Sequence, residues 1–203
     1  MKTTSESRNR VIEIELNEQR DKSEKERRNN LKKYSRDVQR KKRRIAQILI
    51  LWRNCFSKFR IASNLLRMIF LKTLLNALSE LLTLYNLSIT EPLELQSILD
   101  RDKRSNCIRG IIEVDSRNIL LFILSRNDAI GRKEISPLII QLYNSRLEDM
   151  IICTDTTFEE SAINTCRETS KEIRIALCRM EKFADRIEEN QNLKDIIMGL
   201  FQD

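Results

Sequence analysis

Residues 107–124 read CIRGIIEVDSRNILLFIL and contain two apolar runs, 107–114 and 119–124, on either side of the polar segment 115–118. Runs as short as these suit either a buried strand or part of a buried helix, and local pattern alone does not separate the two. Because no partner strand is visible elsewhere in the sequence, we interpret both runs as helices. The polar segment is then a turn, with Asn118 as the cap of the second helix.

The composition of the whole chain favours the same interpretation. Its 203 residues include only 3 Gly and 2 Pro, although the hairpins of a sheet protein are rich in such turn residues. Leu, Ile, Lys, Arg and Glu dominate, and most of these residues tolerate a helix well. The sequence therefore predicts an all-α fold.

Upstream of the two runs, the pattern predicts helices over residues 45–59 and 61–85, followed by a break at 86–92. Thr90 is a plausible N-cap there, and Pro92 falls in the first turn of a further helix. Residues 45–87 are very apolar but are interrupted by charged side chains, whereas a membrane helix needs about 18 uninterrupted apolar residues. We expect core helices, with a membrane helix as the alternative. The sequence leaves open what covers the apolar helix at 61–87.

Downstream, Ser136 and Pro137 are expected to open another helix, and residues 154–157 to form a polar loop. The clearest amphipathic pattern covers residues 158–187, which predicts one long helix with its apolar stripe inward. A short last helix is expected at 193–201. Residues 45–203 are thus predicted to be a stack or bundle of seven or eight helices.

The excess positive charge of the chain lies in its first fifth. The chain has 37 Lys and Arg and 30 Asp and Glu; residues 1–44 hold 16 and 8 of these, which leaves 21 and 22 for the rest. The arm, residues 1–44, thus carries +8 and the body, residues 45–203, carries −1. The arm has too few apolar residues to offset the entropy of ordering, so we expect it to be flexible or partly helical and to fold on a partner. Its last five residues, Arg40 to Arg44, are all basic and suit nucleic acid, an acidic protein groove or a nuclear-transport receptor.

Catalytic chemistry has few candidate residues in this sequence. There is no His, and the three scattered glycines do not form a phosphate-binding loop. The five cysteines have no C-x-x-C spacing, so we expect no metal site, no cofactor and no enzyme activity. Free thiols suit a reducing compartment, and residues 1–44 contain no apolar run of the kind found in a signal peptide. We expect a cytoplasmic and nuclear protein.

Residues 8–29, RNRVIEIELNEQRDKSEKERRN, resemble the importin-beta-binding arm of the importin alpha family. Arg8 and Arg10 stand for the arginine cluster of that arm, and Ile14-Glu15-Leu16 matches its apolar-acidic-apolar centre. Arg27-Arg28-Asn29 matches the closing basic motif. Residues 93–128 are similar to the first armadillo repeat of the same family, with helices ending near Arg and a turn at Asp115.

This resemblance implies a nuclear-import adaptor with an armadillo-like body that binds an importin beta-like receptor and possibly nuclear-localisation-signal cargo. The implied receptor-binding residues are Arg8, Arg10, Leu16, Arg20, Lys22, Arg27, Arg28, Arg40, Lys41, Lys42, Arg43 and Arg44. Two alternatives stay open. One is a nucleic-acid-binding helical protein whose arm contacts phosphates without reading sequence, and the other is a helical scaffold.

Overall fold

The computed structural model describes residues 3–59, 64–99, 104–126, 128–169, 173–189 and 192–202. The chain divides into two compact units, Met1–Arg44 and Ile45–Asp203. Helix α1 spans Thr3–Phe59, so the described part of the first unit is helical. The residues of α1 from Ile45 onward belong to the second unit.

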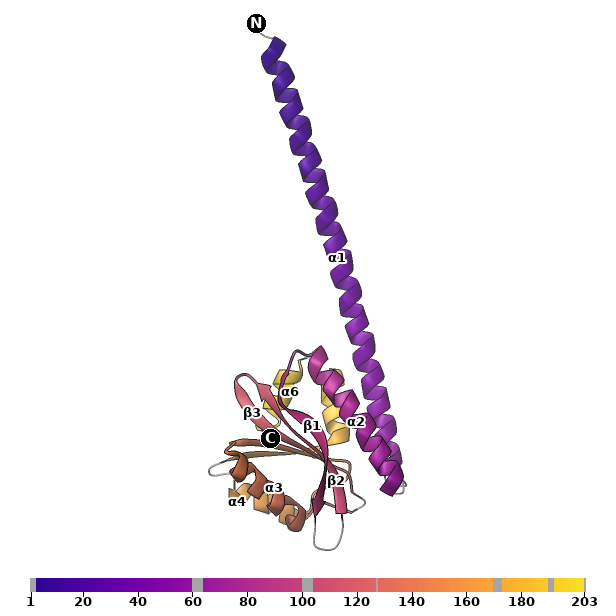
Figure 1. Ribbon diagram of the computed structural model, residues 1–203, viewed down its shortest axis with the longest axis vertical. Coiled ribbons are helices and arrows are strands. Elements are labelled where there is room, and N and C mark those ends of the chain that lie inside the picture. The colour runs from indigo at the N-terminus through magenta and orange to yellow at the C-terminus, as the bar shows by residue number, and fades with distance from the viewer. Residues whose placement is uncertain are drawn as a thin grey trace. The chain divides into compact units, whose positions relative to one another are not determined.

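The second unit is built on a five-stranded sheet in the order β1-β2-β3-β4-β5 (Figure 1). Strand β2 runs antiparallel to its neighbours β1 and β3, whereas β3, β4 and β5 run parallel to one another. The connections follow from this, because parallel strands require crossover helices whereas antiparallel strands can be joined by a tight turn. The strands are β1 Ser88–Leu99, β2 Arg104–Val114, β3 Arg117–Leu124, β4 Asp149–Thr154 and β5 Arg174–Arg179.

Helices cover both faces of this sheet (Figure 1). One hydrophobic cluster joins one face of the sheet to the last part of α1 and to α2, α5 and α6. The other joins the opposite face to α3 and α4. The second unit is therefore a three-layer α/β/α structure. Its remaining helices are α2 Asn64–Leu84, α3 Arg132–Ser145, α4 Glu160–Thr169, α5 Met180–Glu189 and α6 Leu193–Gly199.

Strand β3 shows why its sequence is apolar without a break. Ile119, Leu121 and Ile123 belong to the first cluster, whereas the side chains between them belong to the second. Successive side chains of a strand point to opposite faces, so a strand covered on both sides needs apolar residues at every position. All six residues from Ile119 to Leu124 are buried.

The expectation of an all-α fold is wrong. Both runs of the segment 107–124 are strands, β2 and β3, and they pair antiparallel with each other. The polar segment between them is a turn, as expected, but it closes a hairpin: Asp115 and Ser116 have φ of 50° and 64°, and Val114 pairs with Arg117. Positive φ at both central residues is typical of a two-residue hairpin turn of type I′. Asn118 lies in β3 and caps no helix.

Two more segments that were expected to be helical contain strands. The segment after Pro92 belongs to β1, so Thr90 is a strand residue rather than an N-cap. The long helix expected over 158–187 is divided by β5 between α4 and α5. In β5, Ala176 and Cys178 are buried in the first cluster, whereas the partly buried Leu177 packs against the second. The armadillo-like body is therefore ruled out, because an armadillo repeat consists of helices only.

Other expectations are confirmed. Helix α2 lies within the apolar segment 61–85, α3 covers the helix expected around Pro137, and α6 begins at Leu193. The expected start at Ser136 is four residues too late, because α3 begins at Arg132. Pro137 lies in its second turn and supplies no N–H to the carbonyl of Lys133. Leu71, Leu74, Leu78 and Leu81 of α2 are buried in the first cluster, which shows what covers much of this apolar helix. Among the described residues, no helix is both long and apolar enough to cross a membrane.

Candidate nucleic-acid interface

The arm is an exposed helix over the part of it whose side chains are described. Every side chain from Lys22 to Asp37 is exposed. Between Lys22 and Arg44 the sequence has 12 Lys and Arg and 3 Asp and Glu, a difference of +9. Because α1 is helical here, the positions of these charges around the helix follow from the rotation of about 100° per residue.

Eight of the 12 basic residues fall within about 120° of the helix circumference, given a 100° rotation per residue. We call this stripe the basic face. It extends over 22 residue steps, which is about 33 Å at 1.5 Å per residue. The stripe is thus as long as about one helical turn of duplex DNA, 34–36 Å. The basic face consists of Lys22, Lys25, Lys32, Lys33, Arg36, Arg40, Arg43 and Arg44.

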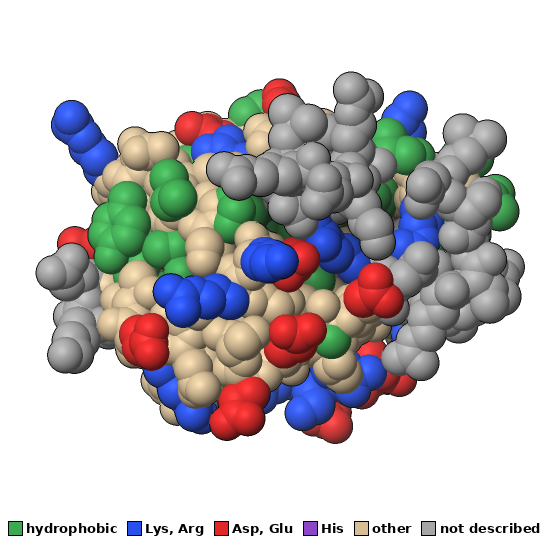
Figure 2. Space-filling model, turned by 90° about the horizontal axis from the view of Figure 1, so that it is seen from below, with side chains coloured by type: hydrophobic (Ala, Val, Ile, Leu, Met, Phe, Trp, Pro, Cys, Tyr) green, Lys and Arg blue, Asp and Glu red, His purple; other side chains and the backbone are tan. Residues whose placement is uncertain are grey.

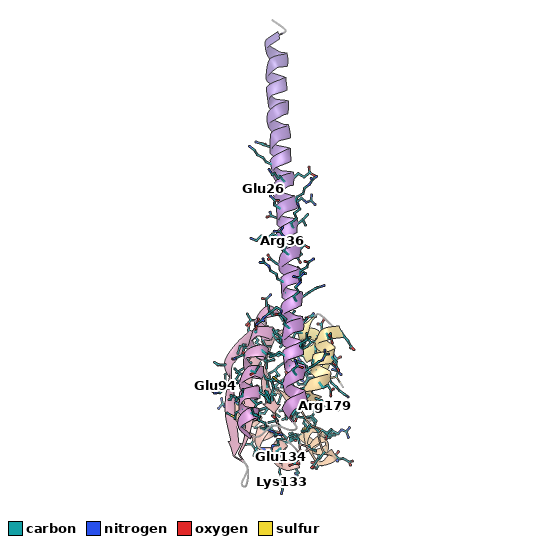
Figure 3. All side chains as sticks on the ribbon, turned by 90° about the vertical axis from the view of Figure 1, so that its right-hand side faces the viewer. Glu26, Arg36, Glu94, Lys133, Glu134 and Arg179 are labelled. Carbon is teal, nitrogen blue, oxygen red and sulfur yellow. The ribbon has the colours of Figure 1, made fainter. Side chains whose placement is uncertain are left out.

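The few apolar residues of this segment lie on the other side of the helix. Leu31, Tyr34 and Val38 follow a 3,4 spacing and fall opposite the basic face. The side chains of Leu31 and Tyr34 are 60% and 70% exposed. Side chains radiate from α1 all the way round, as Figure 3 shows near the labelled Glu26 and Arg36. The single aromatic ring of the arm therefore does not share a surface with most of its cations.

Internal pairing removes little of the positive charge of the arm. Arg28 Nη2 lies 2.7 Å from Glu24 Oε1, one helical turn away, and both side chains are largely exposed. Such exposed i,i+4 pairs stabilise a helix by only about 0.3–0.5 kcal/mol and exchange readily with other partners. The other two acidic residues between Lys22 and Arg44 are Glu26 and Asp37, which lie at one margin of the basic face.

The structure separates the residues that the sequence grouped as one receptor-binding site. Lys22, Arg40, Arg43 and Arg44 are on the basic face, whereas Arg27, Arg28, Lys41 and Lys42 are distributed over the rest of the helix. For Arg8, Arg10, Leu16 and Arg20 the backbone lies in α1, and their side chains are outside the described residues.

Four residues of the basic face were missed by the sequence reasoning. Lys25 lies between the matched motifs of the family-like segment 8–29, and Lys32, Lys33 and Arg36 lie between that segment and the terminal basic run. Their signal was present in the spacing, since Lys25, Lys32, Arg36 and Arg43 are separated by 7, 4 and 7 residues. Such intervals place side chains on one helix face.

The surface of the second unit has a different charge pattern. On the face in Figure 2, Lys and Arg side chains are interspersed with Asp and Glu. Arg53 Nη2 lies 2.8 Å from Asp185 Oδ1 and also contacts Glu188, and these two carboxylates, Glu188 foremost, raise the pKa of Arg53. Lys194 Nζ lies 3.0 Å from Asp115 Oδ1. Mixed, paired charge of this kind does not create a strong field of one sign.

The second unit also has a polar cluster where β3 and β4 end. The carboxylate of Asp155 accepts hydrogen bonds from the backbone N–H of Arg126, at 3.1 Å, and from Ser125 Oγ, at 3.2 Å. Arg126 Nη1 in turn lies 2.9 Å from Glu134 Oε1, and Glu134 also accepts from the backbone N–H of Gly131. Burial raises the pKa of Asp155, and the hydrogen bonds from Arg126 and Ser125 oppose that rise. The hydrogen bonds of this cluster link the end of β3 to the loop after β4 and to the start of α3.

Metal-binding and thiol chemistry have little support in the part of the chain that the structure describes. No group of three His, Cys, Asp or Glu side chains there is placed to hold a metal ion. The five cysteines form no disulfide with one another, and all of them are buried. Burial raises the pKa of Cys107 to about 12 and that of Cys166 to about 11, so both are protonated thiols at neutral pH.

The nuclear-import adaptor expected from the sequence is wrong. Residues 93–128 resemble an armadillo repeat in sequence, but where the structure describes them they contain parts of β1 and all of β2 and β3 instead of a repeat of helices. A body of this architecture has no solenoid surface for cargo peptides. The importin beta-like partner lacks support once the resemblance in the body is removed.

Comparison with known proteins gives slight likenesses to nucleases. No family model matches the chain, and neither does any curated protein. One similar solved structure is the DNA modification-dependent restriction endonuclease AspBHI, at 16% identity and a TM-score of 0.38, over 74% of this chain and 38% of that one. Another is the MspJI restriction endonuclease in complex with a 27-mer oligonucleotide, at 10% identity and a TM-score of 0.27, over 62% and 30%. The chain thus spans less than two fifths of either protein, and likenesses at this level say nothing about its function.

Proposed function

We propose that this protein binds nucleic acid through phosphate contacts made by the basic face of its arm. The observation that carries the proposal is the stripe of eight Lys and Arg side chains along one side of α1, with a charge difference of +9 over residues 22–44. Duplex DNA carries one negative charge per about 1.7 Å of its axis, so a stripe about 33 Å long spans many phosphates.

The binding is driven by the release of counterions from the nucleic acid. Each cation that neutralises a phosphate frees a condensed ion, and log Kobs then falls with log salt by about 0.9 per contact on B-DNA. If all eight residues of the basic face bind phosphates, the slope approaches about −7. A straight helix cannot follow a curved backbone along its whole length, so we expect a smaller value.

The same geometry favours binding without sequence reading. Tyr34, the only aromatic residue of the arm, lies opposite the basic face and does not stack on a base while that face contacts the backbone. Lys and Arg contacts to phosphates fix the position of a protein on nucleic acid but carry no direct sequence information. The proposal therefore assigns to the arm a binding role, with no reaction, at sites where nucleic acid is accessible, in the cytoplasm and the nucleus.

The test compares two charge-matched variants of the full chain. One changes Lys25, Lys32, Arg36 and Arg43 to Gln, which removes four charges from the basic face. The other changes Arg27, Arg28, Lys41 and Lys42 to Gln, which removes the same charge from the remaining faces. Gln keeps the helix propensity of Lys and Arg. Binding to a 20-base-pair duplex is measured by fluorescence anisotropy over a series of salt concentrations.

We expect the basic-face variant to bind about a hundredfold more weakly at 0.1 M salt and its salt slope to fall by about three units. The variant on the other faces should lose much less. A third variant with Lys72, Arg117, Lys133 and Arg132 changed to Gln removes four charges from the second unit and should bind nearly as the unchanged protein. Equal losses in all three variants would show that net charge alone is responsible, and an unchanged slope for the basic-face variant would contradict the proposal.

A further inference from the structure

The second unit contains a groove of about 470 Å³ that runs beside β5. Five consecutive residues of the strand, from Ile175 to Arg179, line it. One wall comes from α4 and contributes Ile163, Cys166 and Arg167. Lys182 and Arg186 of α5 form the other wall. The groove therefore follows the strand and lies between the two helix layers.

Among the strands of the described residues, β5 is the last of its sheet, with β4 on one side and no strand on the other. The labelled side chains in Figure 3 mark the two ends of the sheet: Glu94 of β1 and Arg179 of β5 lie on opposite sides of the second unit. An edge strand presents a row of backbone N–H and C=O groups that can pair with another chain. The groove lies along this row.

The register of β4 and β5 identifies which groups face the groove. The N–H of Arg174 donates to the carbonyl of Glu148 at 2.7 Å, so the backbone of Arg174 is directed to the β4 side. Orientation alternates along a strand, and Ala176 and Cys178 therefore also face β4. Ile175 and Leu177 direct their N–H and C=O groups to the open edge, and Arg179 directs its N–H there, while its carbonyl accepts from Cys178 Sγ at 3.4 Å.

The charged groups that line the groove all have one sign. They are Arg167, Arg179, Lys182 and Arg186, and the lining residues that the structure describes include no Asp or Glu. Arg179 Nη2 lies 3.3 Å from Glu181 Oε2 at the rim. An exposed pair of that kind contributes little to stability, so a carboxylate in the groove can replace Glu181 at small cost. Between these cations the groove is apolar, with Ile163, Leu177 and Leu200.

We propose that this groove binds an extended acidic segment of a partner protein, which adds to the sheet as a strand beside β5. A peptide backbone supplies both donors and acceptors to the outward groups of Ile175, Leu177 and Arg179, whereas a phosphate backbone supplies acceptors only. The side chains of an added strand point alternately to the two faces. Carboxylates on one face meet Arg167, and those on the other meet Lys182 and Arg186.

A second copy of the chain is a poor occupant of the same edge. Two copies of β5 side by side would bring Arg174 and Arg179 of one copy next to those of the other, and like charges on adjacent strands are destabilising. Nucleic acid would satisfy the cations of the groove but would leave the outward N–H groups and carbonyls of β5 without a matching ladder. The peptide proposal is independent of the function proposed for the arm.

The test uses the full-length ¹⁵N-labelled protein and a capped Glu-Val peptide of eight residues, Glu-Glu-Val-Val-Glu-Glu-Val-Val, which places carboxylates on both faces of an added strand. We expect amide hydrogen exchange at Ile175, Leu177 and Arg179 to slow by about tenfold or more at saturation, since these N–H groups gain acceptors. Exchange at Ala176 and Cys178, which already face β4, should change little. A peptide in which Lys replaces Glu is the charge control and should not bind.

The matched variants reverse two charges each. Arg179→Glu with Lys182→Glu should weaken the peptide at least about tenfold, whereas Arg132→Glu with Lys133→Glu, on the exposed start of α3, should leave its affinity within about twofold. Failure of the Glu-Val peptide to protect Leu177, or equal losses in the two variants, would overturn the proposal. So would protection of Leu177 by a 20-base-pair duplex in place of the peptide, which would assign the groove to nucleic acid.

Discussion

The arm and the second unit use their side chains in opposite ways. From Lys22 to Asp37 every side chain of α1 is exposed, and the helix depends on local terms such as the Arg28–Glu24 pair. From Ile45 onward the same helix contributes Ile48, Leu49 and Trp52 to a hydrophobic cluster. Most helical stability in proteins comes from packing of an apolar face rather than from propensity. The arm is therefore the part of the molecule whose structure a ligand can change most easily.

This difference also separates the two proposed binding modes. The arm offers excess positive charge over a long exposed surface, which suits a polyanion and responds strongly to salt. The groove beside β5 offers backbone groups and charge on a packed sheet, which suits one extended chain and responds to substitution at single positions. The following changes test whether the two regions behave as differently as their packing implies.

The largest effect is expected from Trp52→Ala. Trp52 is 1% exposed, and its ring lies 5.9 Å from that of Phe183 in an edge-to-face arrangement. Its removal should lower the free energy of unfolding by about 3–5 kcal/mol, because it leaves a large cavity. Leu31→Ala, on the exposed part of the same helix, should change it by less than about 0.5 kcal/mol. Urea unfolding followed by circular dichroism measures both, and equal effects would show that the two parts of α1 are not packed differently.

A smaller effect is expected from Asp149→Asn. The carboxylate of Asp149, which is nearly buried, pairs with the Arg174 guanidinium through two hydrogen bonds, one of them 2.6 Å from Nε to Oδ1. The guanidinium also lies 5.0 Å from the centre of the Phe201 ring. Loss of this charge-assisted pair between β4 and β5 should cost about 1–3 kcal/mol. Glu91 pairs with Arg109 and is the more exposed side chain of that pair. Glu91→Gln should therefore lower the free energy of unfolding by at most about 1 kcal/mol in the same measurement.

The polar cluster predicts how stability depends on pH. Burial raises the pKa of Asp155 in the folded protein above its value in the unfolded chain, so the folded state binds this proton more tightly. The contribution of Asp155 to the free energy of unfolding is then most favourable below the unfolded pKa, and it declines as the pH rises through the folded pKa. Asp155→Asn should remove this decline. Unfolding curves between about pH 4 and pH 7 check it, and an unchanged pH dependence in the variant would contradict the assignment.

The smallest effect is expected from Glu24→Gln in the arm. Loss of the pair with Arg28 should weaken the local helix by about 0.3–0.5 kcal/mol, which is about a twofold faster amide exchange near residue 24. The free energy of unfolding of the second unit should stay the same. An equal acceleration of amide exchange in the core strands would show that the arm helix and the sheet unfold together.

Part of this organisation is determined by the sequence alone. The charge partition needs no structure, since the residue count gives +8 for residues 1–44 and −1 for the rest. Helix α2 and the turn at Asp115 and Ser116 follow from local patterns. The periodic spacing of Lys25, Lys32, Arg36 and Arg43 was also available in the sequence, although the predicted site was built on motifs and omitted three of them.

The sheet and the groove depend on the tertiary structure. In β2 and β3 the apolar runs have no alternation because helices cover both faces, and such runs look like segments of buried helix. Around β5, Ile173, Ala176, Leu177 and Met180 fit the stripe of an amphipathic helix equally well. Only pairing with β4, which lies more than 20 positions earlier in the chain, makes this segment a strand. Local sequence determines which side chains are apolar and will be buried, but contacts between distant segments determine whether the backbone that buries them is a helix or a strand.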